Sequence, residues 1–89
     1  MSEIRRSFGL AVRIFRDRQG WSQAQLAQAS KVDRGYISKI ESGGVDPGLE
    51  MQRRIAAALG INLSELIVQA EEEERRLRRR ADRSSGQTG

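Results

Sequence analysis

The chain of 89 residues carries 16 lysines and arginines against 12 acidic residues, and it contains neither cysteine nor histidine. Disulfides and thiolate metal sites are therefore excluded, and the commonest general base and metal ligand is missing. No apolar run approaches the roughly 20 residues of a membrane span. The net charge of +4 favours a polyanionic partner, most simply nucleic acid.

The first predicted helix runs from Phe8 to Arg18, where apolar residues recur at helical spacing with arginines between them. Gly20 follows and ends this helix. Residues 1–7 should form an arm ahead of it. The basic start of the chain is not followed by the small-residue cleavage site of a signal peptide, so we expect a cytoplasmic protein.

Two short apolar-periodic runs come next, separated only by ASKVD. Ser22 is suited to cap the first helix, and Asp33 to cap the second, which should end at Glu41 or Ser42. Neither run has the roughly 12–15 residues that an isolated helix needs in water. Two such helices joined by a tight turn are expected where the first helix packs on the second and holds it against the surface of a binding partner. A helix-turn-helix does this when its second helix enters the major groove of DNA.

The segment SGGVDPG at 42–48 is a loop, because glycine and proline dominate it. A fourth helix should follow from Leu49 to Leu59 and end at Gly60. One face of this helix is apolar and is predicted to be buried. That face comprises Leu49, Ile55, Ala56 and Leu59.

The fifth predicted helix is capped by Ser64 and anchored in the core by Leu66 and Ile67. A run of glutamates followed by arginines should extend it to about Ala81, and residues 82–89 should be disordered. The ion pairs that would extend the helix lie four residues apart and are each worth roughly 0.2–0.5 kcal/mol. They are Glu71–Arg75, Glu72–Arg76 and Glu74–Arg78.

No segment alternates with the period of a strand, so the chain is predicted to be all-α with five short helices. It resembles the Cro/C1-type (XRE) helix-turn-helix regulators from about Gly9 to Leu66. The resemblance rests on VRIFRDRQGWSQAQLA, VDRGYISKIESG, Pro47 and IAAALGINLSELI, in that order. It implies a five-helix, lambda-repressor-like DNA-binding domain over residues 8–68, with a charged helical extension over 69–81.

The resemblance also implies which residues contact DNA. Base edges would be read by the outer face of the third helix, and phosphates would be held around it. For Arg34 and Lys39 the alternative is a phosphate contact without base reading. For Gln23 it is a solvated position in the helix, and for Tyr36 a partly buried packing role. The implied base-reading residues are Arg34, Gly35, Ser38 and Lys39, and the implied backbone contacts are Ser22, Gln23, Lys31, Tyr36 and Ser42.

Arg16 and Glu41 match a pair that forms a salt bridge between the first and third helices, so the resemblance makes them structural. Three features depart from the family pattern. The loop after the third helix reads GGVDPG, with Asp46 where basic residues often grip phosphate, so backbone contacts there should be weaker or made by glycine amides. Lys31 stands in the turn where glycine is usual, and a left-handed backbone there costs on the order of 1 kcal/mol. Gln52 occupies a usually apolar position of the fourth helix.

One helix in the major groove reads only a few base pairs, so we expect a symmetric homodimer on two half-sites about one helical turn apart. Apolar residues of the fifth helix, together with the region before it, would form the interface. The predicted interface residues are Met51, Ile61, Leu66, Ile67 and Ala70.

The expected function is a sequence-specific transcriptional regulator, a repressor or autoregulator, bound to a pseudo-palindromic operator in the nucleoid. SKVDRGYISKIE looks somewhat like restriction–modification controller proteins, while a phage repressor or an antitoxin is almost as compatible. The alternative class is a protein-interaction module with a partner such as a toxin on the fifth helix. Without histidine or cysteine no catalytic site is recognisable, so we expect no enzyme, cofactor, metal or small-molecule ligand.

Overall fold

The structure, a computed structural model, describes residues 3–87, with side-chain environments through Arg83. In this part of the chain it contains helices and no strand, which confirms the predicted all-α fold. None of the described helices is long and apolar enough to cross a membrane. The helices are α1 (Glu3–Arg18), α2 (Gln23–Ser30), α3 (Arg34–Ser42), α4 (Leu49–Ala58) and α5 (Leu63–Gln87).

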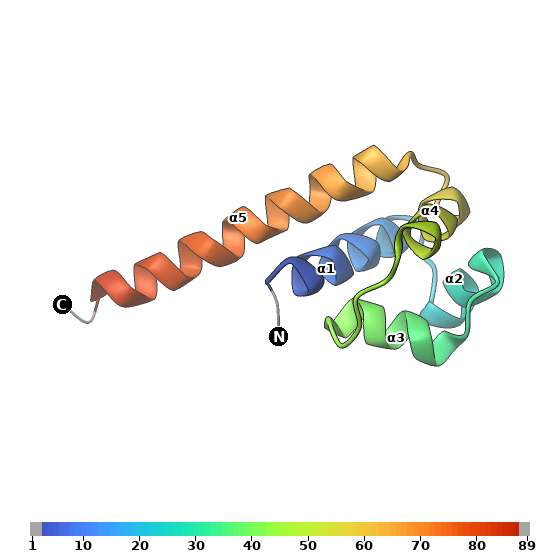
Figure 1. The fold of residues 1–89 in the computed structure, drawn as a ribbon, viewed down its shortest axis with the longest axis horizontal. Coiled ribbons are helices and arrows are strands. Elements are labelled where there is room, and N and C mark those ends of the chain that lie inside the picture. Colours follow the sequence, from blue (N-terminus) through green and yellow to red (C-terminus); the bar gives the residue numbers. More distant parts are fainter. Residues whose placement is uncertain (1–2, 88–89) are drawn as a thin grey trace.

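Helix α1 lies at the centre of the fold, between α5 on one side and α3 on the other (Figure 1). Helix α2 packs on α3 and α4, and the far end of α5 extends beyond the other helices (Figure 1). All five helices contribute to one apolar core. Its buried residues are Phe8, Ala11, Val12, Leu26, Ala27, Val32, Ile37, Ile40, Ile55, Ala56, Leu59, Leu66 and Ala70.

The closest approach between α1 and α3 occurs at Gly9, which is buried. A Cβ atom at this position would overlap the backbone carbonyl oxygens of Ile40 and Glu41. The backbone of α3 cannot move locally as a flexible side chain can, so only glycine fits at this position. The contact therefore fixes the last turn of α3 against α1.

Helices α2 and α3 begin and end where the sequence predicts. The Ser22 hydroxyl accepts from the backbone N–H of Gln25, whose side chain accepts in return from the Ser22 N–H. Asp33 caps α3 by accepting from the backbone N–H of Tyr36. Between the two helices Lys31 adopts the expected left-handed backbone, with a φ of 56°.

The predicted arm over residues 1–7 is wrong from Glu3 onward, because α1 begins there. Ser7 is fully buried within this first part of α1, and its hydroxyl donates to the Glu3 carbonyl. Glu3 also lies 3.7 Å from the Arg78 guanidinium of α5. Helix α1 thus begins earlier than predicted because its first turns pack against α5. This tertiary contact cannot be read from the local sequence. Residues 1–2 lie outside the described part.

Ser64 was predicted as the N-cap of α5, but the helix already begins at Leu63. Asn62 precedes it, and its backbone N–H donates to the Glu65 carboxylate at 3.1 Å. That contact is one half of a capping box. Asparagine and serine cap about equally well, so the acid three residues after Asn62 was the signal that distinguishes them.

Helix α5 continues to Gln87, past the predicted end at Ala81. The tail predicted to be disordered from 82 is therefore helical as far as it is described, and residues 88–89 lie outside the described part. Among the described side chains, one of the three predicted pairs forms, with Glu74 and Arg78 3.7 Å apart. In place of Glu71–Arg75 and Glu72–Arg76, the pairs are Glu72–Arg75 and Glu73–Arg76, three residues apart.

Helix α4 buries Ile55 and Leu59 as predicted, but Leu49 is 65% exposed. Gln52 lies instead on the half-buried side of the helix, and its amide donates to the Pro47 carbonyl at 3.0 Å. This hydrogen bond satisfies the polar group at a usually apolar position and closes the loop before α4. At helical spacing Gln52 falls in the middle of the face on which Ile55 and Leu59 are buried, whereas Leu49 falls at its margin.

Candidate nucleic-acid interface

The outer face of α3 carries polar side chains, while Ile37 and Ile40 anchor its opposite face in the core. The helical repeat puts the exposed residues on one continuous strip. We call this strip the α3 ridge. It contains all four predicted base-reading residues and consists of Arg34, Gly35, Ser38, Lys39 and Ser42, each of them exposed.

A hollow lies on each side of the α3 ridge. The polar hollow is formed by α1, the start of α2 and α3, and the apolar hollow by the turn, the start of α3 and α4. Arg13, Arg16, Gln23, Ser38, Glu41 and Ser42 line the polar hollow. Lys31, Val32, Asp33, Gly35, Tyr36, Lys39 and Met51 line the apolar hollow. A ridge with a recess on either side has the shape that fits a major groove between two phosphate backbones.

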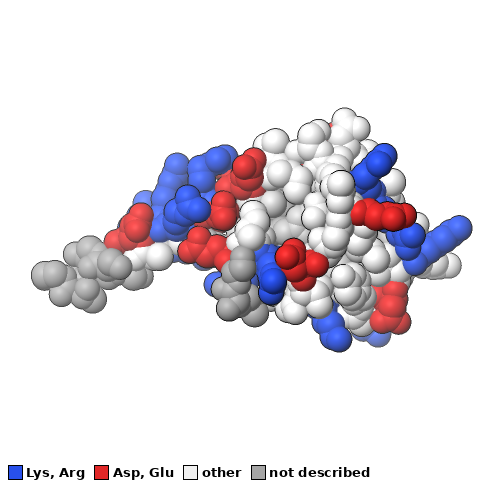
Figure 2. All heavy atoms as spheres, viewed as in Figure 1, with Lys and Arg blue, Asp and Glu red and all other residues white. Residues whose placement is uncertain are grey.

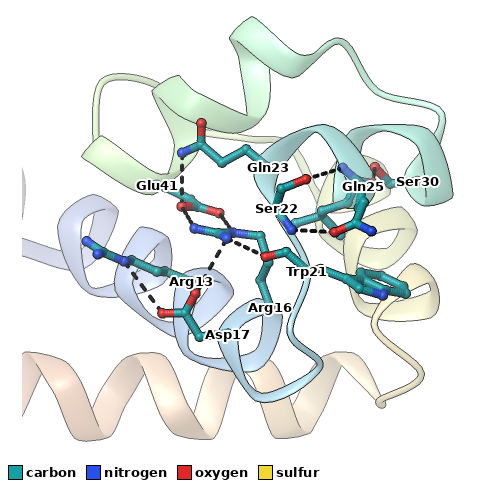
Figure 3. A network of polar contacts seen from close by, with 10 residues as sticks. Arg13, Arg16, Asp17, Trp21, Ser22, Gln23, Gln25, Ser30 and Glu41 are labelled. Atoms are coloured by element: carbon teal, nitrogen blue, oxygen red, sulfur yellow. Dashed lines mark hydrogen bonds and ion pairs between the residues drawn. The ribbon is translucent and has the colours of Figure 1, made fainter.

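The floor of the polar hollow is an ion pair between α1 and α3, the pair that the sequence resemblance implied (Figure 3). Arg16 Nε donates to Glu41 Oε2 at 2.7 Å, and Nη2 donates to Oε1 at 2.9 Å. The two side chains are only 11% and 5% exposed. The hydrogen bonds with Glu41 raise the pKa of Arg16 in spite of its partial desolvation. The third Arg16 nitrogen, Nη1, donates to the Trp21 carbonyl at 2.6 Å.

Gln23 at the start of α2 turns its side chain toward this pair (Figure 3). Its Nε2 donates to Glu41 Oε1 at 3.1 Å, a contact that the sequence did not predict. An amide nitrogen carries two hydrogens. One of them is engaged by Glu41, and the other is left for a ligand in the polar hollow.

The other predicted backbone contacts surround the α3 ridge. Lys31 is exposed and Tyr36 is half-buried, and both border the apolar hollow. Ser42 borders the polar hollow and donates its hydroxyl to the Lys39 carbonyl at 3.1 Å. Ser22 is exposed, with its hydroxyl engaged in capping α2.

Two residues of the site were not assigned to it from the sequence. Arg13 lines the polar hollow, with its side chain 63% exposed. The available signal was its place three residues before Arg16, on the same side of α1. Met51 lines the apolar hollow beside the α3 ridge, although it was predicted to lie in a dimer interface.

The predicted dimer interface is wrong for Leu66 and Ala70, which are fully buried in the chain's own core. Helix α1 packs along α5 and contributes to covering these two side chains. Ile61 and Ile67 are partly buried against the same core. Among the described side chains of α5, the exposed large apolar one is Val68, at 61%.

The described residues contain no group of three or more acidic side chains gathered as a metal site would require. The charged groups of the site are instead arranged around the α3 ridge. They combine exposed cations with one neutralised ion pair and with the exposed Asp33 carboxylate, which caps α3. Such an arrangement suits a polyanion, because the cations are accessible and the buried carboxylate is already paired.

Comparison with protein families and known proteins gives a consistent result. Residues 12–66 match the family model described as helix-turn-helix. The HTH-type transcriptional regulator SlrR of Bacillus subtilis (strain 168) is 39% identical over 60 residues, which are 66% of this chain and 40% of SlrR. This chain therefore spans less than half the length of SlrR. Control protein C.MunI of Mycoplasma sp is 36% identical over 74 residues, which are 82% of this chain and 100% of C.MunI.

Among solved structures, the chain is similar to the clp gene regulator ClgR of Corynebacterium glutamicum. The TM-score is 0.88 and the sequence identity 28%, and the match covers 92% of this chain and 87% of that chain. The similarity extends beyond the region of the family match and includes most of the described chain.

Proposed function

The chain belongs to the helix-turn-helix family, and from this premise we propose that it is a sequence-specific DNA-binding transcriptional regulator that reads a pseudo-palindromic operator as a homodimer. The observation that carries the proposal is the α3 ridge with a hollow on each side. A helix in the major groove has one phosphate backbone on either side of it. The exposed cation Lys31, beside the apolar hollow, then lies where one of those backbones passes.

In this proposal the α3 ridge reads bases. Arg34 stands at the first turn of α3, exposed, with a guanidinium that can donate twice to O6 and N7 of guanine. Ser38 and Lys39 follow on the same strip. Gly35 offers no side chain, so it permits a close approach of the helix to the bases.

Phosphates are held around the ridge. Gln23 contacts a phosphate of one DNA strand in the polar hollow. Lys31 and Tyr36 contact phosphates of the other strand at the apolar hollow. Ser42, at the end of the ridge, lies beside the polar hollow. Such contacts position the protein on the duplex, while base contacts supply sequence information.

The homodimer is supported by an apolar surface outside the core. Val68 on α5 is 61% exposed and Leu49 on α4 is 65% exposed. Figure 2 shows a largely uncharged area over the first part of α5. We propose that the outer face of α5 around Val68, with Ile61, replaces the interface predicted from the sequence. Sedimentation equilibrium of the free chain should then give twice the chain mass.

Within this class, a controller-like autoregulator is supported by the similarity to control protein C.MunI, which spans that protein's whole length. An autoregulator represses or activates the promoter of its own gene. The sign depends on where the operator lies relative to the promoter, so it is a property of the DNA.

The test of the proposal is selection of binding sites from random duplexes, followed by fluorescence anisotropy across a salt series. The expected result is a symmetric motif bound at least about 10³-fold more tightly than a scrambled duplex. The opposite result is equal affinity for every sequence with the same salt dependence, which reflects phosphate contacts alone. In that case the chain would be a protein-interaction module, and a stable heteromeric partner should be sought.

Arg34→Ala sharpens this test. It should relax the preference at one position in each half-site by about 1–3 kcal/mol, because one bidentate base contact is lost. The matched control is Arg79→Ala, which removes the same charge from the exposed end of α5. The control should keep the full motif. If Arg34→Ala weakens all sequences equally, Arg34 is a phosphate contact and not a base reader.

A further inference from the structure

The polar hollow brings together side chains from three helices, but the cation at its floor is already used. All three nitrogens of Arg16 donate, two to Glu41 and one to the Trp21 carbonyl. The charges of Arg16 and Glu41 cancel, so this pair alone does not attract a phosphate. The hollow has one further guanidinium, that of Arg13.

We propose that Arg13 binds a DNA phosphate in the polar hollow, next to the Gln23 amide, and that Asp17 competes with DNA for it in the free protein. The inference rests on the proposed function in one respect, namely that the anion is the backbone of duplex DNA. It adds a residue of α1 to a set of contacts otherwise made by α2 and α3.

Arg13 is accessible and only weakly held. Its side chain is 63% exposed, and its Nε lies 3.7 Å from Asp17 Oδ2, which is longer than a hydrogen bond. Figure 3 shows the two terminal nitrogens of Arg13 pointing away from Asp17. A guanidinium presents its N–H groups as a planar fork that matches the oxygens of a phosphate. Arg13 can therefore take up an anion without breaking a strong contact.

The polar groups beside Arg13 complete the site. Glu41 holds the Gln23 amide by accepting one of its hydrogens, which orients the nitrogen at the edge of the hollow. Glu41 thus acts as a positioning residue for Gln23. Its own charge is balanced by Arg16, so it does not repel a phosphate as a free carboxylate would.

The position of the hollow decides which strand Arg13 contacts. The polar hollow borders the α3 ridge at Ser38 and Ser42, and the apolar hollow borders it at Gly35 and Lys39. The two hollows thus flank the ridge as the two backbones flank a major groove. Arg13 then holds the strand opposite to the one held from the apolar hollow, and the duplex is clamped on both sides.

Asp17 sets the affinity of this contact. It is 59% exposed, 3.7 Å from Arg13 and 3.4 Å from Arg16. In the free protein it partly neutralises Arg13. When DNA is bound it becomes a like charge near the phosphate. Both effects oppose binding, so removing the Asp17 charge should strengthen it.

The experiment uses the full chain and its selected operator duplex, with affinity measured by anisotropy between low and moderate salt. Arg13→Ala should weaken binding about tenfold on operator and scrambled duplex alike, the size expected for a charge-assisted hydrogen bond. The slope of log affinity against log salt should fall by about 1, because one phosphate contact is lost. Circular dichroism should show an unchanged fold, because Arg13 is exposed.

The matched control is Arg18→Ala, which removes the same charge from the same helix. Arg18 lies outside the polar hollow and is stacked on the Phe15 ring, 5.0 Å from its centroid. It should change the affinity less than about twofold and leave the salt slope unchanged. Asp17→Asn should tighten binding in the wild-type background by more than it does in the Arg13→Ala background.

Duplexes that carry a single neutral methylphosphonate identify the contacted phosphate. One position in each half-site should weaken wild-type binding and have a much smaller effect on Arg13→Ala, in which only the neutral Gln23 amide remains beside that phosphate. If Arg13→Ala keeps the wild-type affinity and salt slope on a duplex that the wild type selects, the phosphate site is refuted and the operator model stands. If the wild type selects no motif but Arg13→Ala still lowers the salt slope, the operator model falls and the phosphate site stands.

Discussion

The two ends of the molecule use the same chemistry in different surroundings. In the packed body, formed by α1 to α4 and the first part of α5, Arg16 and Glu41 pair with side chains that are 11% and 5% exposed. In the α5 extension, residues 71–83, Arg75 and Glu72 pair while 53% and 41% exposed. Both are arginine–glutamate pairs at hydrogen-bonding distance. The two pairs differ in their effect on stability, because the loss of one partner destabilises the fold much more when the remaining charge is buried.

In the body pair the bidentate partner of Arg16 is fixed, although Asp17 lies 3.4 Å from a third nitrogen of the guanidinium. Glu41 accepts from Arg16 and Gln23, and the backbone contact at Gly9 fixes the spacing between their helices. An arginine of the extension, in contrast, can reach an acid three or four residues earlier, and water competes for both. The sequence resemblance therefore implied the body pair correctly, whereas two of the three pairs predicted in the extension were wrong.

The largest effect is expected from Glu41→Ala. It leaves the nearly buried Arg16 charge with only the exposed Asp17 carboxylate nearby, so the free energy of unfolding should fall by up to about 3–5 kcal/mol. Chemical denaturation measures this directly. Glu72→Ala removes the same side chain from the extension and should change the unfolding transition very little. Comparable losses in the two variants would contradict the contrast between the two regions.

A smaller effect is expected from Gly9→Ala. The added methyl group meets backbone carbonyls of α3, so α1 and α3 must separate, at a cost of about 1–3 kcal/mol. Thermal unfolding followed by circular dichroism would detect it. Gly35→Ala is the control, since a Cβ there meets no backbone atom and its close neighbour is a side chain, the Asp33 carboxylate that caps α3. Equal stability of the Gly9 variant and the wild type would mean that the body is less tightly packed than described.

Lys31→Gly should act in the opposite direction on stability. Glycine relieves the left-handed backbone at φ 56°, which should raise the free energy of unfolding by about 1 kcal/mol. The same change removes a cation next to the apolar hollow, so DNA affinity should fall while stability rises. Denaturation and anisotropy on one preparation separate the two effects. A parallel fall of both would show that the lysine side chain supports the fold.

The smallest effect concerns acid and the α5 extension. The hydrogen bond from Arg75 lowers the pKa of Glu72, so this carboxylate favours the helix above its unfolded pKa of about 4.3. The contribution disappears as the pH falls through the lowered folded value. The wild type should therefore exceed Glu72→Gln in helicity of the extension at neutral pH, and the difference should vanish in strong acid. Chemical shifts of residues 71–83 report it, and a difference that grows in acid would contradict it.

The local features of this protein were determined by the sequence. The caps at Ser22 and Asp33 and the left-handed Lys31 each depend on groups within a few residues of one another. The order of motifs around them was sufficient to recognise the helix-turn-helix family. Such features are predictable because their hydrogen-bonding partners are neighbours in the chain.

Tertiary structure alone decided the features that depend on which helices meet. Because α1 packs along α5, α1 is helical from Glu3 onward. The same packing buries Leu66 and Ala70, whereas Val68 stays exposed. The meeting of three helices turns Gln23 toward Glu41 and puts Arg13 in the polar hollow. The periodicity of a helix shows that it has an apolar face, but a partner helix determines how much of that face is covered.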